Sequence, residues 1–141
     1  MKLMSSDELL EWMQVFANGV GRQPPGFWYL ASPYSKYPQG TAAAFEEVCK
    51  AAAWCIQHGI FIHCPIAESH PIALHGGMDS MDHDFWLDND LPKIEAAVGM
   101  IVCKMETWEE STGLLWERDQ FRDAGKPVVY LEWPGGQLIR E

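Results

Sequence analysis

Basic side chains are scarce in this sequence of 141 residues. Ten Lys and Arg stand against 20 Asp and Glu, which gives a formal net charge of −10. A surface of this sign repels a polyanion, so we expect no duplex nucleic acid as a partner. Apolar runs of about 18 residues are also absent, and the polar stretch MSSDELL lies where a secretory leader would be apolar. We therefore expect a cytoplasmic protein that contacts no membrane.

Closely spaced metal-binding pairs are absent too. The cysteines lie within apolar segments without a Cys-x-x-Cys pair, which favours reduced core thiols over disulfides: Cys49, Cys55, Cys64 and Cys103. The histidines form no pair at the i, i+4 helical spacing. We expect neither a metal nor another cofactor.

What remains is typical of one ordered domain, because 48% of the residues are hydrophobic and 12% are aromatic. Ser5 and Glu8 have the spacing of a capping box, which predicts a helix over about residues 6–18. The Gly- and Pro-containing stretch NGVGRQPPG follows it. We divide the chain into an N-terminal helix and linker, 1–25, and an α/β domain, 26–141.

Within that domain, short apolar runs alternate with helical patterns. Strands are predicted in 27–32, 60–65, 98–104 and 126–133, and helices in 41–59, around 87–98 and from about 111. Pro92 lies either in the first turn of its helix or at a kink. Residues 66–84 are predicted to form a long loop, which is uncommon unless functional. Continuous apolar strands alternating with helices indicate a doubly wound parallel sheet of four to five strands.

In such sheets, ligands bind beyond the carboxyl ends of the strands. Here these ends carry the polar and unusual residues of three segments: 29–34, 63–70 and 104–111. The histidines His63 and His70 are therefore expected near a pocket.

A carboxylate interrupts the apolar stripe of the helix that begins near residue 111. The stripe contains Leu114, Phe121 and Ala124, and Glu117 occupies a core position in it. Ser111 is a natural N-cap and Gly113 has no side chain, so a ligand has room above Glu117 while helix N–H groups favour an anion. The alternative is that Ser111 only caps the helix and Glu117 points to solvent.

Three segments together, WYLASPYS, HDFWLDNDL and TWEESTGLLWE, resemble the nucleoside 2-deoxyribosyltransferase-like superfamily. The similarity covers about residues 27–131 and is greatest to an uncharacterised branch with YLA-x-PYS, HDFWL and W-x-x-S-x-G-x-x-x-E motifs. It implies a flavodoxin-like domain and an enzyme, an N-glycosidase or a deoxyribosyltransferase, that acts on a nucleoside or nucleotide.

The resemblance also implies residue roles. Glu117 matches the nucleophile of characterised relatives, and Tyr29 matches the tyrosine beside it. Asp90 is the best match to the acid that serves the leaving base, with Asp84 and Asp88 as rivals. Alternatively, Asp90 before Leu-Pro is a helix N-cap. One departure is that many relatives have an Asp entering the third strand, where this chain has Val98 or Gly99.

Relatives with a serine six residues before the glutamate take nucleoside 5′-monophosphates, and this chain has Ser111 there. The expected substrate-binding residues are Ser111, Gly113, Ser32, Pro33, Ser35, His70 and Trp108. Trp86 and Trp116 are further candidates for stacking on a base. The resemblance implies a homo-oligomer, a dimer or tetramer. The base, the sugar, and hydrolysis versus transfer stay open, and the alternatives are a nucleotide-sensing module without catalysis and a scaffold.

Overall fold

A computed structural model of the chain describes residues 4–19 and 25–141. The helices are α1 (Ser6–Asn18), α2 (Thr41–Gln57), α3 (Pro65–Gly76), α4 (His83–Ala96) and α5 (Thr112–Asp123), with a short 3-10 helix, η1, at Trp108–Glu110. The strands are β1 (Trp28–Ala31), β2 (Ile62–His63), β3 (Gly99–Lys104), β4 (Val128–Glu132) and β5 (Gln137–Arg140).

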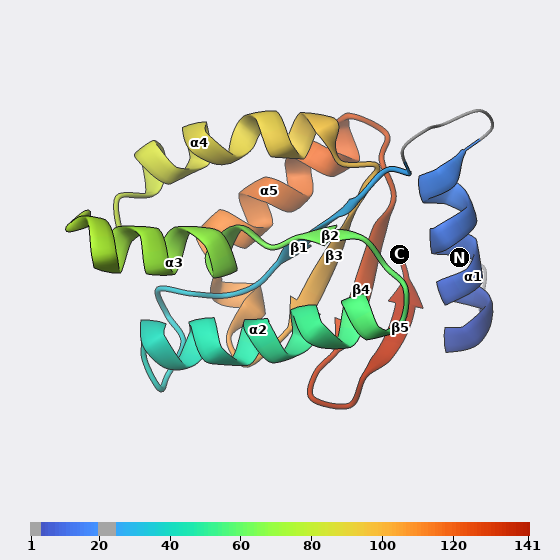
Figure 1. Ribbon diagram of the computed structural model, residues 1–141, viewed down its shortest axis with the longest axis horizontal. Helices are drawn as coiled ribbons and strands as arrows, with labels where there is room; N and C mark the ends of the chain where they lie inside the picture. The colour runs from blue at the N-terminus through green and yellow to red at the C-terminus, as the bar shows by residue number, and fades with distance from the viewer. Residues whose placement is uncertain (1–3, 20–24) are drawn as a thin grey trace.

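These strands form one sheet in the order β2-β1-β3-β4-β5 (Figure 1). The first four are parallel, and β5 pairs antiparallel with β4 at the edge. This is the strand order of a flavodoxin-like doubly wound sheet, so the predicted fold class is confirmed. Within the described residues, no helix is long and apolar enough to cross a membrane.

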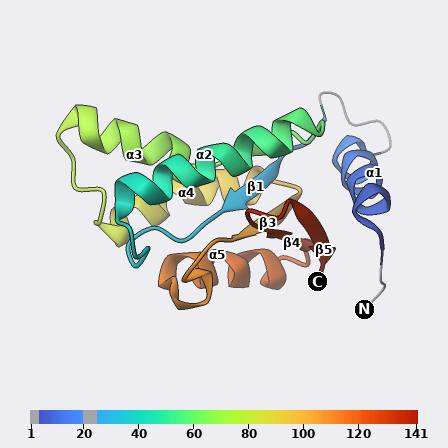
Figure 2. The same cartoon turned by 90° about the horizontal axis from the view of Figure 1, so that it is seen from below.

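Helices cover both faces of the sheet, with α1 and α2 packed in one hydrophobic core and α4 and α5 in the other. Figure 2 shows α2 and α5 on opposite sides of the strands. Strand β1 serves both cores, because successive side chains of a strand point to opposite faces. Trp28 and Leu30 belong to the first core, and Tyr29 and Ala31 to the second. This alternation directs the Tyr29 ring toward α5.

A steric constraint acts at Gly99, one of the two positions, Val98 or Gly99, at which many members of the resembled superfamily have an aspartate. Trp28 pairs with Gly99 across the sheet, and a Cβ added at Gly99 would collide with the Trp28 ring and lie 2.8 Å from the Pro127 carbonyl oxygen. The Trp28 indole Nε1 in turn donates a hydrogen bond of 3.3 Å to the carbonyl of Met13 in α1. An aspartate therefore has no room at Gly99, where the ring that anchors α1 lies.

The predicted loop over 66–84 is wrong for its first half, because residues 65–76 form α3. Pro71 lies inside this helix. A proline removes one backbone hydrogen bond, whereas Pro65 in the first turn is favourable because no partner is needed there. Gly77, with φ of 67°, ends the helix in the left-handed conformation that glycine adopts readily.

Helix α4 begins earlier than the sequence pattern indicated. It starts at His83, so Pro92 lies in its interior rather than in a first turn. Asp90 also lies well inside α4, which excludes the N-cap alternative for this residue.

Candidate functional site

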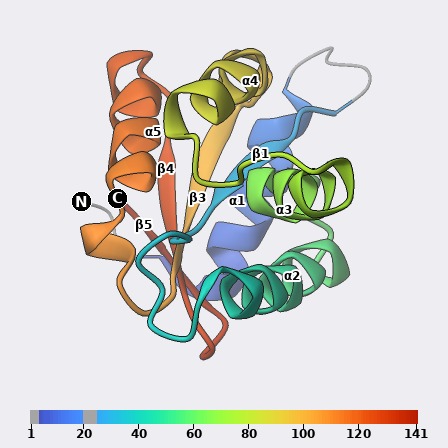
Figure 3. The ribbon, with the colours of Figure 1, turned by 90° about the vertical axis from the view of Figure 1, so that its left-hand side faces the viewer.

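A cleft opens at the carboxyl end of β1, lined by residues from the starts of α3 and α5 and from α4. Figure 3 shows the ribbon of these elements. The empty space of the cleft, including the solvent-filled mouth, is about 590 Å³. It is lined by Ser32, Tyr34, Ser35, Pro65, Ile66, Ser69, Ser80, His83, Trp86, Leu87, Asp90, Ser111, Gly113, Leu114 and Glu117.

Glu117 lines this cleft as a buried acid, with only 7% of its surface exposed. Helix α5 places it there: the Ser111 hydroxyl caps the helix by accepting a bond of 3.3 Å from the Leu114 N–H, and Leu114 and Phe121 share the buried face. The alternative that Glu117 points to solvent is therefore wrong.

The environment of Glu117 favours its protonated form. Burial raises the pKa of Glu117 to about 8, which the Tyr29 hydrogen bond opposes and the charge of Asp90 reinforces. The Tyr29 hydroxyl donates to Glu117 Oε2. Burial, followed by the charges of Glu117 and Asp90, also holds the pKa of Tyr29 well above its usual 10, so Tyr29 remains a donor throughout the physiological range.

Asp90 supplies a second buried carboxyl group from α4, and it is also 7% exposed. Burial raises the pKa of Asp90 to about 6, while the charge of Lys93 lowers it. The two rivals for its role, Asp84 and Asp88, are exposed and do not line the cleft. Asp90 is therefore the one of these three aspartates whose position in the cleft suits the role of the acid.

Between pH values of about 6 and 8, these two carboxyl groups together hold about one proton. One group is then available as a proton donor and the other as a carboxylate. This is the minimum equipment for acid–base or nucleophilic chemistry on a bound ligand.

Hydroxyl groups and a helix N-terminus line the mouth of the cleft. Ser111 and Gly113 open α5, and Ser32 and Ser35 follow β1. The Ser32 hydroxyl is buried and has no hydrogen-bond partner among the described residues. Such a group is free to bond a ligand, and together these donors suit an anionic one.

Three of the expected substrate-binding residues do not line the cleft. Pro33 is buried beside it. His70 lies behind the cleft wall, where its Nδ1 is 2.6 Å from the Tyr34 hydroxyl and its ring stacks on Phe45 at a centroid distance of 4.6 Å. Trp108 packs edge-on against Tyr130, at 5.7 Å between ring centroids. Of the three tryptophans considered for stacking, Trp86 is the one that lines the cleft.

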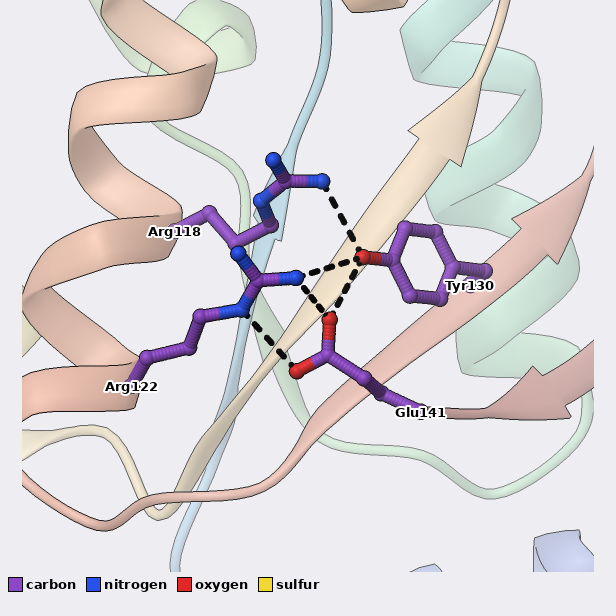
Figure 4. Close-up of polar contacts among 4 residues, drawn as sticks. All are labelled: Arg118, Arg122, Tyr130 and Glu141. Atoms are coloured by element: carbon purple, nitrogen blue, oxygen red, sulfur yellow. Dashed lines mark hydrogen bonds and ion pairs between the residues drawn. The ribbon is translucent and has the colours of Figure 1, made fainter. Parts of the chain in front are cut away.

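The opposite side of α5 is held by a polar cluster at β4 (Figure 4). The Tyr130 hydroxyl accepts a bond of 3.1 Å from Arg118 and donates one of 2.8 Å to Glu141, which also pairs with Arg122. These contacts join α5 to β4 and to Glu141.

Sequence reasoning missed several lining residues. His83 and Leu87 belong to the HDFWL segment, in which only Asp84 and Trp86 were considered as functional. Ser69 was hidden because its helix was predicted as a loop. Helical spacing of Leu87 and Asp90 is the signal that would have grouped the α4 residues on one face.

Comparison with known families gives a match to the model for a domain of unknown function, DUF1937, over residues 26–133. The chain belongs to the DUF1937 family. The DUF1937 match begins after α1 and includes every residue that lines the cleft. No curated protein matches the chain. In the part of this DUF1937 protein that the structure describes, no group of three His, Cys, Asp or Glu side chains could hold a metal ion.

Proposed function

We propose that this DUF1937 protein is an N-glycosidase or deoxyribosyltransferase that acts on a nucleoside 5′-monophosphate. The observation that carries this proposal is the pair of buried carboxyl groups, Glu117 and Asp90, lining one cleft from different helices, with Tyr29 bonded to Glu117. The resemblance to the nucleoside 2-deoxyribosyltransferase-like superfamily adds the substrate class. The proposed setting is the cytoplasm.

In the proposed reaction, a Glu117 carboxylate oxygen bonds to the sugar C1′ as the bond from C1′ to the base nitrogen breaks. The electron pair of the broken bond stays on the base, which takes the proton of Asp90. Water or a second base then attacks C1′, Asp90 accepts the proton that is released, and Glu117 leaves as a carboxylate. Tyr29 donates to Glu117 and orients it.

The proton must lie on Asp90 when the reaction starts. In the free protein, the pKa of Glu117, about 8, lies above that of Asp90, about 6, so a single proton rests mainly on Glu117. Positive charge developing at C1′ stabilises an ionised Glu117, and so favours the arrangement in which the proton lies on Asp90. Because one carboxylate and one proton are both required, the rate of base release should follow a bell-shaped pH profile with limbs near 6 and 8.

The donors at the cleft mouth support a monophosphate as substrate. Ser111 offers a hydroxyl hydrogen and α5 its N-terminal N–H groups, while Gly113 lets the ligand approach closely. Lys36, the cation that follows Ser35 in the sequence, is exposed and does not line the cleft. The phosphate would thus be held by neutral donors and the helix dipole.

The proposal includes a homo-oligomer, a dimer or tetramer. Exposed apolar side chains on α3, α4 and the segment between them give such an assembly a surface to bury: Ile72, Leu74, Met78, Met81 and Phe85. Light scattering of the purified protein measures the mass, and a monomer would contradict this part of the proposal.

The test of the proposed activity is incubation of the pure protein with a panel of ribo- and deoxyribonucleoside 5′-monophosphates, followed by chromatography for free base. We expect release from at least one member, either in water alone or after a second base is added. Thermal shifts with the same panel then identify the alternative. Stabilisation without release of base would indicate a sensing module. The absence of both stabilisation and release would contradict nucleotide recognition altogether.

A further inference from the structure

A line of charged side chains leads from the cleft wall across α4 to α3. Lys93 follows Asp90 by three residues in α4, so the two side chains are neighbours on the helix surface. The Lys93 ammonium is 2.9 Å from Glu68 Oε1 on α3. Glu68 Oε2 is in turn 3.6 Å from His63 Nδ1 at the end of β2. Glu68 therefore joins α3 to α4 and to the end of β2, one helical turn from Asp90.

Of the groups that face Asp90, only a few carry charge at neutral pH. Tyr29 from β1 is neutral because its pKa is held high, and Glu117 from α5 is largely protonated. Burial lowers the pKa of His63, so this residue is also neutral. That leaves Lys93 as the cation and Glu68 as the anion whose fields act on Asp90.

We propose that Lys93 and Glu68 are positioning residues that set the acidity of the Asp90 carboxyl group from outside the cleft. Lys93 stabilises the Asp90 carboxylate. Glu68 holds the ammonium between α3 and α4 and offsets part of its charge. The pair thereby keeps Asp90 able both to give up a proton and to take it back, a role that rests on the proposed function in which Asp90 is the acid.

The pair has opposite effects on Asp90, which separates this role from simple fastening of α3 to α4. Removing the Lys93 charge leaves the carboxylate without its stabilising cation, so the pKa of Asp90 should rise. Removing the Glu68 charge takes away a repelling anion and leaves Lys93 unopposed, so the pKa should fall. If the ion pair only held α3 against α4, the two substitutions would not shift the pKa of Asp90 in opposite directions.

Carboxyl carbon NMR of the ¹³C-labelled protein titrates Asp90 directly and needs no substrate. The Asp90 resonance is assigned by its loss in Asp90→Asn. We expect Lys93→Met to raise the pKa of Asp90 by about 0.5 or more, and Glu68→Gln to lower it by a smaller amount. Lys93→Gln can still donate a hydrogen bond to Glu68, and it should raise the pKa of Asp90 as much as Lys93→Met does. This variant distinguishes the effect of the Lys93 charge from the effect of the contact between α3 and α4.

Lys50→Met is the matched control, because Lys50 forms a comparable ion pair of 3.3 Å with Glu47 on α2, away from the cleft. It should leave the pKa of Asp90 unchanged. An Asp90 pKa that stays within about 0.2 of the unmodified protein in the Lys93 and Glu68 variants, or moves in the same direction in both, overturns the proposal. If the pKa moves as expected while no nucleotide is cleaved, the tuning stands and the proposed function fails.

Discussion

At the scale of the residue, the central feature is an acid that folding makes hard to ionise. Glu117 is buried, its hydrogen bond comes from Tyr29, and its nearest acidic neighbour is the buried Asp90. Burying a carboxyl group costs stability whenever the group must be charged. A fold keeps such a residue at a core position most readily when its chemistry is used.

This cost has a defined pH dependence. The pKa of Glu117 rises from 4.5 to about 8 on folding, so between these values the folded protein binds a proton that the unfolded chain has lost. The free energy of unfolding therefore falls as the pH rises through this range. Glu117→Gln removes this pH-dependent loss of stability, and it keeps an oxygen that can accept a hydrogen bond from Tyr29.

We expect the stability of Glu117→Gln relative to the unmodified protein to increase by about 2 kcal/mol or more between pH values of about 5 and 8.5. Urea unfolding of both proteins at each pH measures the difference. A difference that stays constant would mean that Glu117 is ionised throughout and that Tyr29 fully offsets its burial.

At the scale of the element, the first turn of α5 combines a cap with an open approach. Gly113 has an ordinary helical conformation, and a Cβ added there would meet only His83 Nδ1, at 3.9 Å. That is a normal contact, so the fold does not need a glycine at this position. The missing side chain instead keeps the cleft open above Glu117.

Gly113→Ala should therefore separate stability from function. We expect the free energy of unfolding to rise by about 0.5 to 1 kcal/mol, because alanine loses less backbone entropy in a helix than glycine does. Base release should fall, because the added methyl group narrows the cleft. Thermal unfolding and the rate assay test the two halves. Undiminished activity would show that the ligand does not pass over this turn.

Ser111 gives the same turn its expected preference for phosphate. Its hydroxyl accepts from Leu114 N–H and still has a hydrogen to donate. A charge-assisted hydrogen bond contributes about 1.5 to 3 kcal/mol, so a nucleoside 5′-monophosphate should bind at least about tenfold more tightly than its nucleoside. Ser111→Asp should reverse this order by repelling the phosphate. Calorimetry with one matched pair measures both, and a preference of the unmodified protein for the free nucleoside would make the assignment wrong.

The elements also show which signals the sequence carries. The buried runs of β1 and β3 and the stripe of α5 were predicted because each buries a continuous or periodic apolar surface. Helix α3 was missed because its segment was interpreted as part of a His- and Gly-containing loop, and few of its residues are buried. Strand β5 was not recognised because one face of it is exposed, so its QLIR has few apolar residues.

The site was partly predictable for a related reason. Gly113 and Glu117 lie four residues apart in α5, so their position on one face of the helix follows from the 3.6-residue period alone. The packing of α3, α4 and α5 brings Asp90 into the same cleft as Glu117, and it places His70 behind Tyr34. No spacing within a single segment carries that information.

At the scale of the whole molecule, the two faces of the doubly wound sheet have different roles. Trp28 points toward α1 and anchors it through Met13, whereas its neighbour Tyr29 points toward α5 and reaches Glu117. The net charge of −10 disfavours polyanions at long range, whereas we expect local donors to decide whether a small anion binds in the cleft. The central claim is that this architecture presents Glu117 to the sugar of a nucleotide.

The most direct test of that claim compares initial rates of base release by the unmodified protein and by Glu117→Gln, using the monophosphate that is cleaved fastest. Near-ultraviolet circular dichroism of both proteins confirms that the cleft is intact. We predict that the Gln variant is folded and slower by at least about two orders of magnitude, because an amide cannot form the glycosyl bond. Equal rates in the two proteins would contradict the account and remove Glu117 from the chemistry.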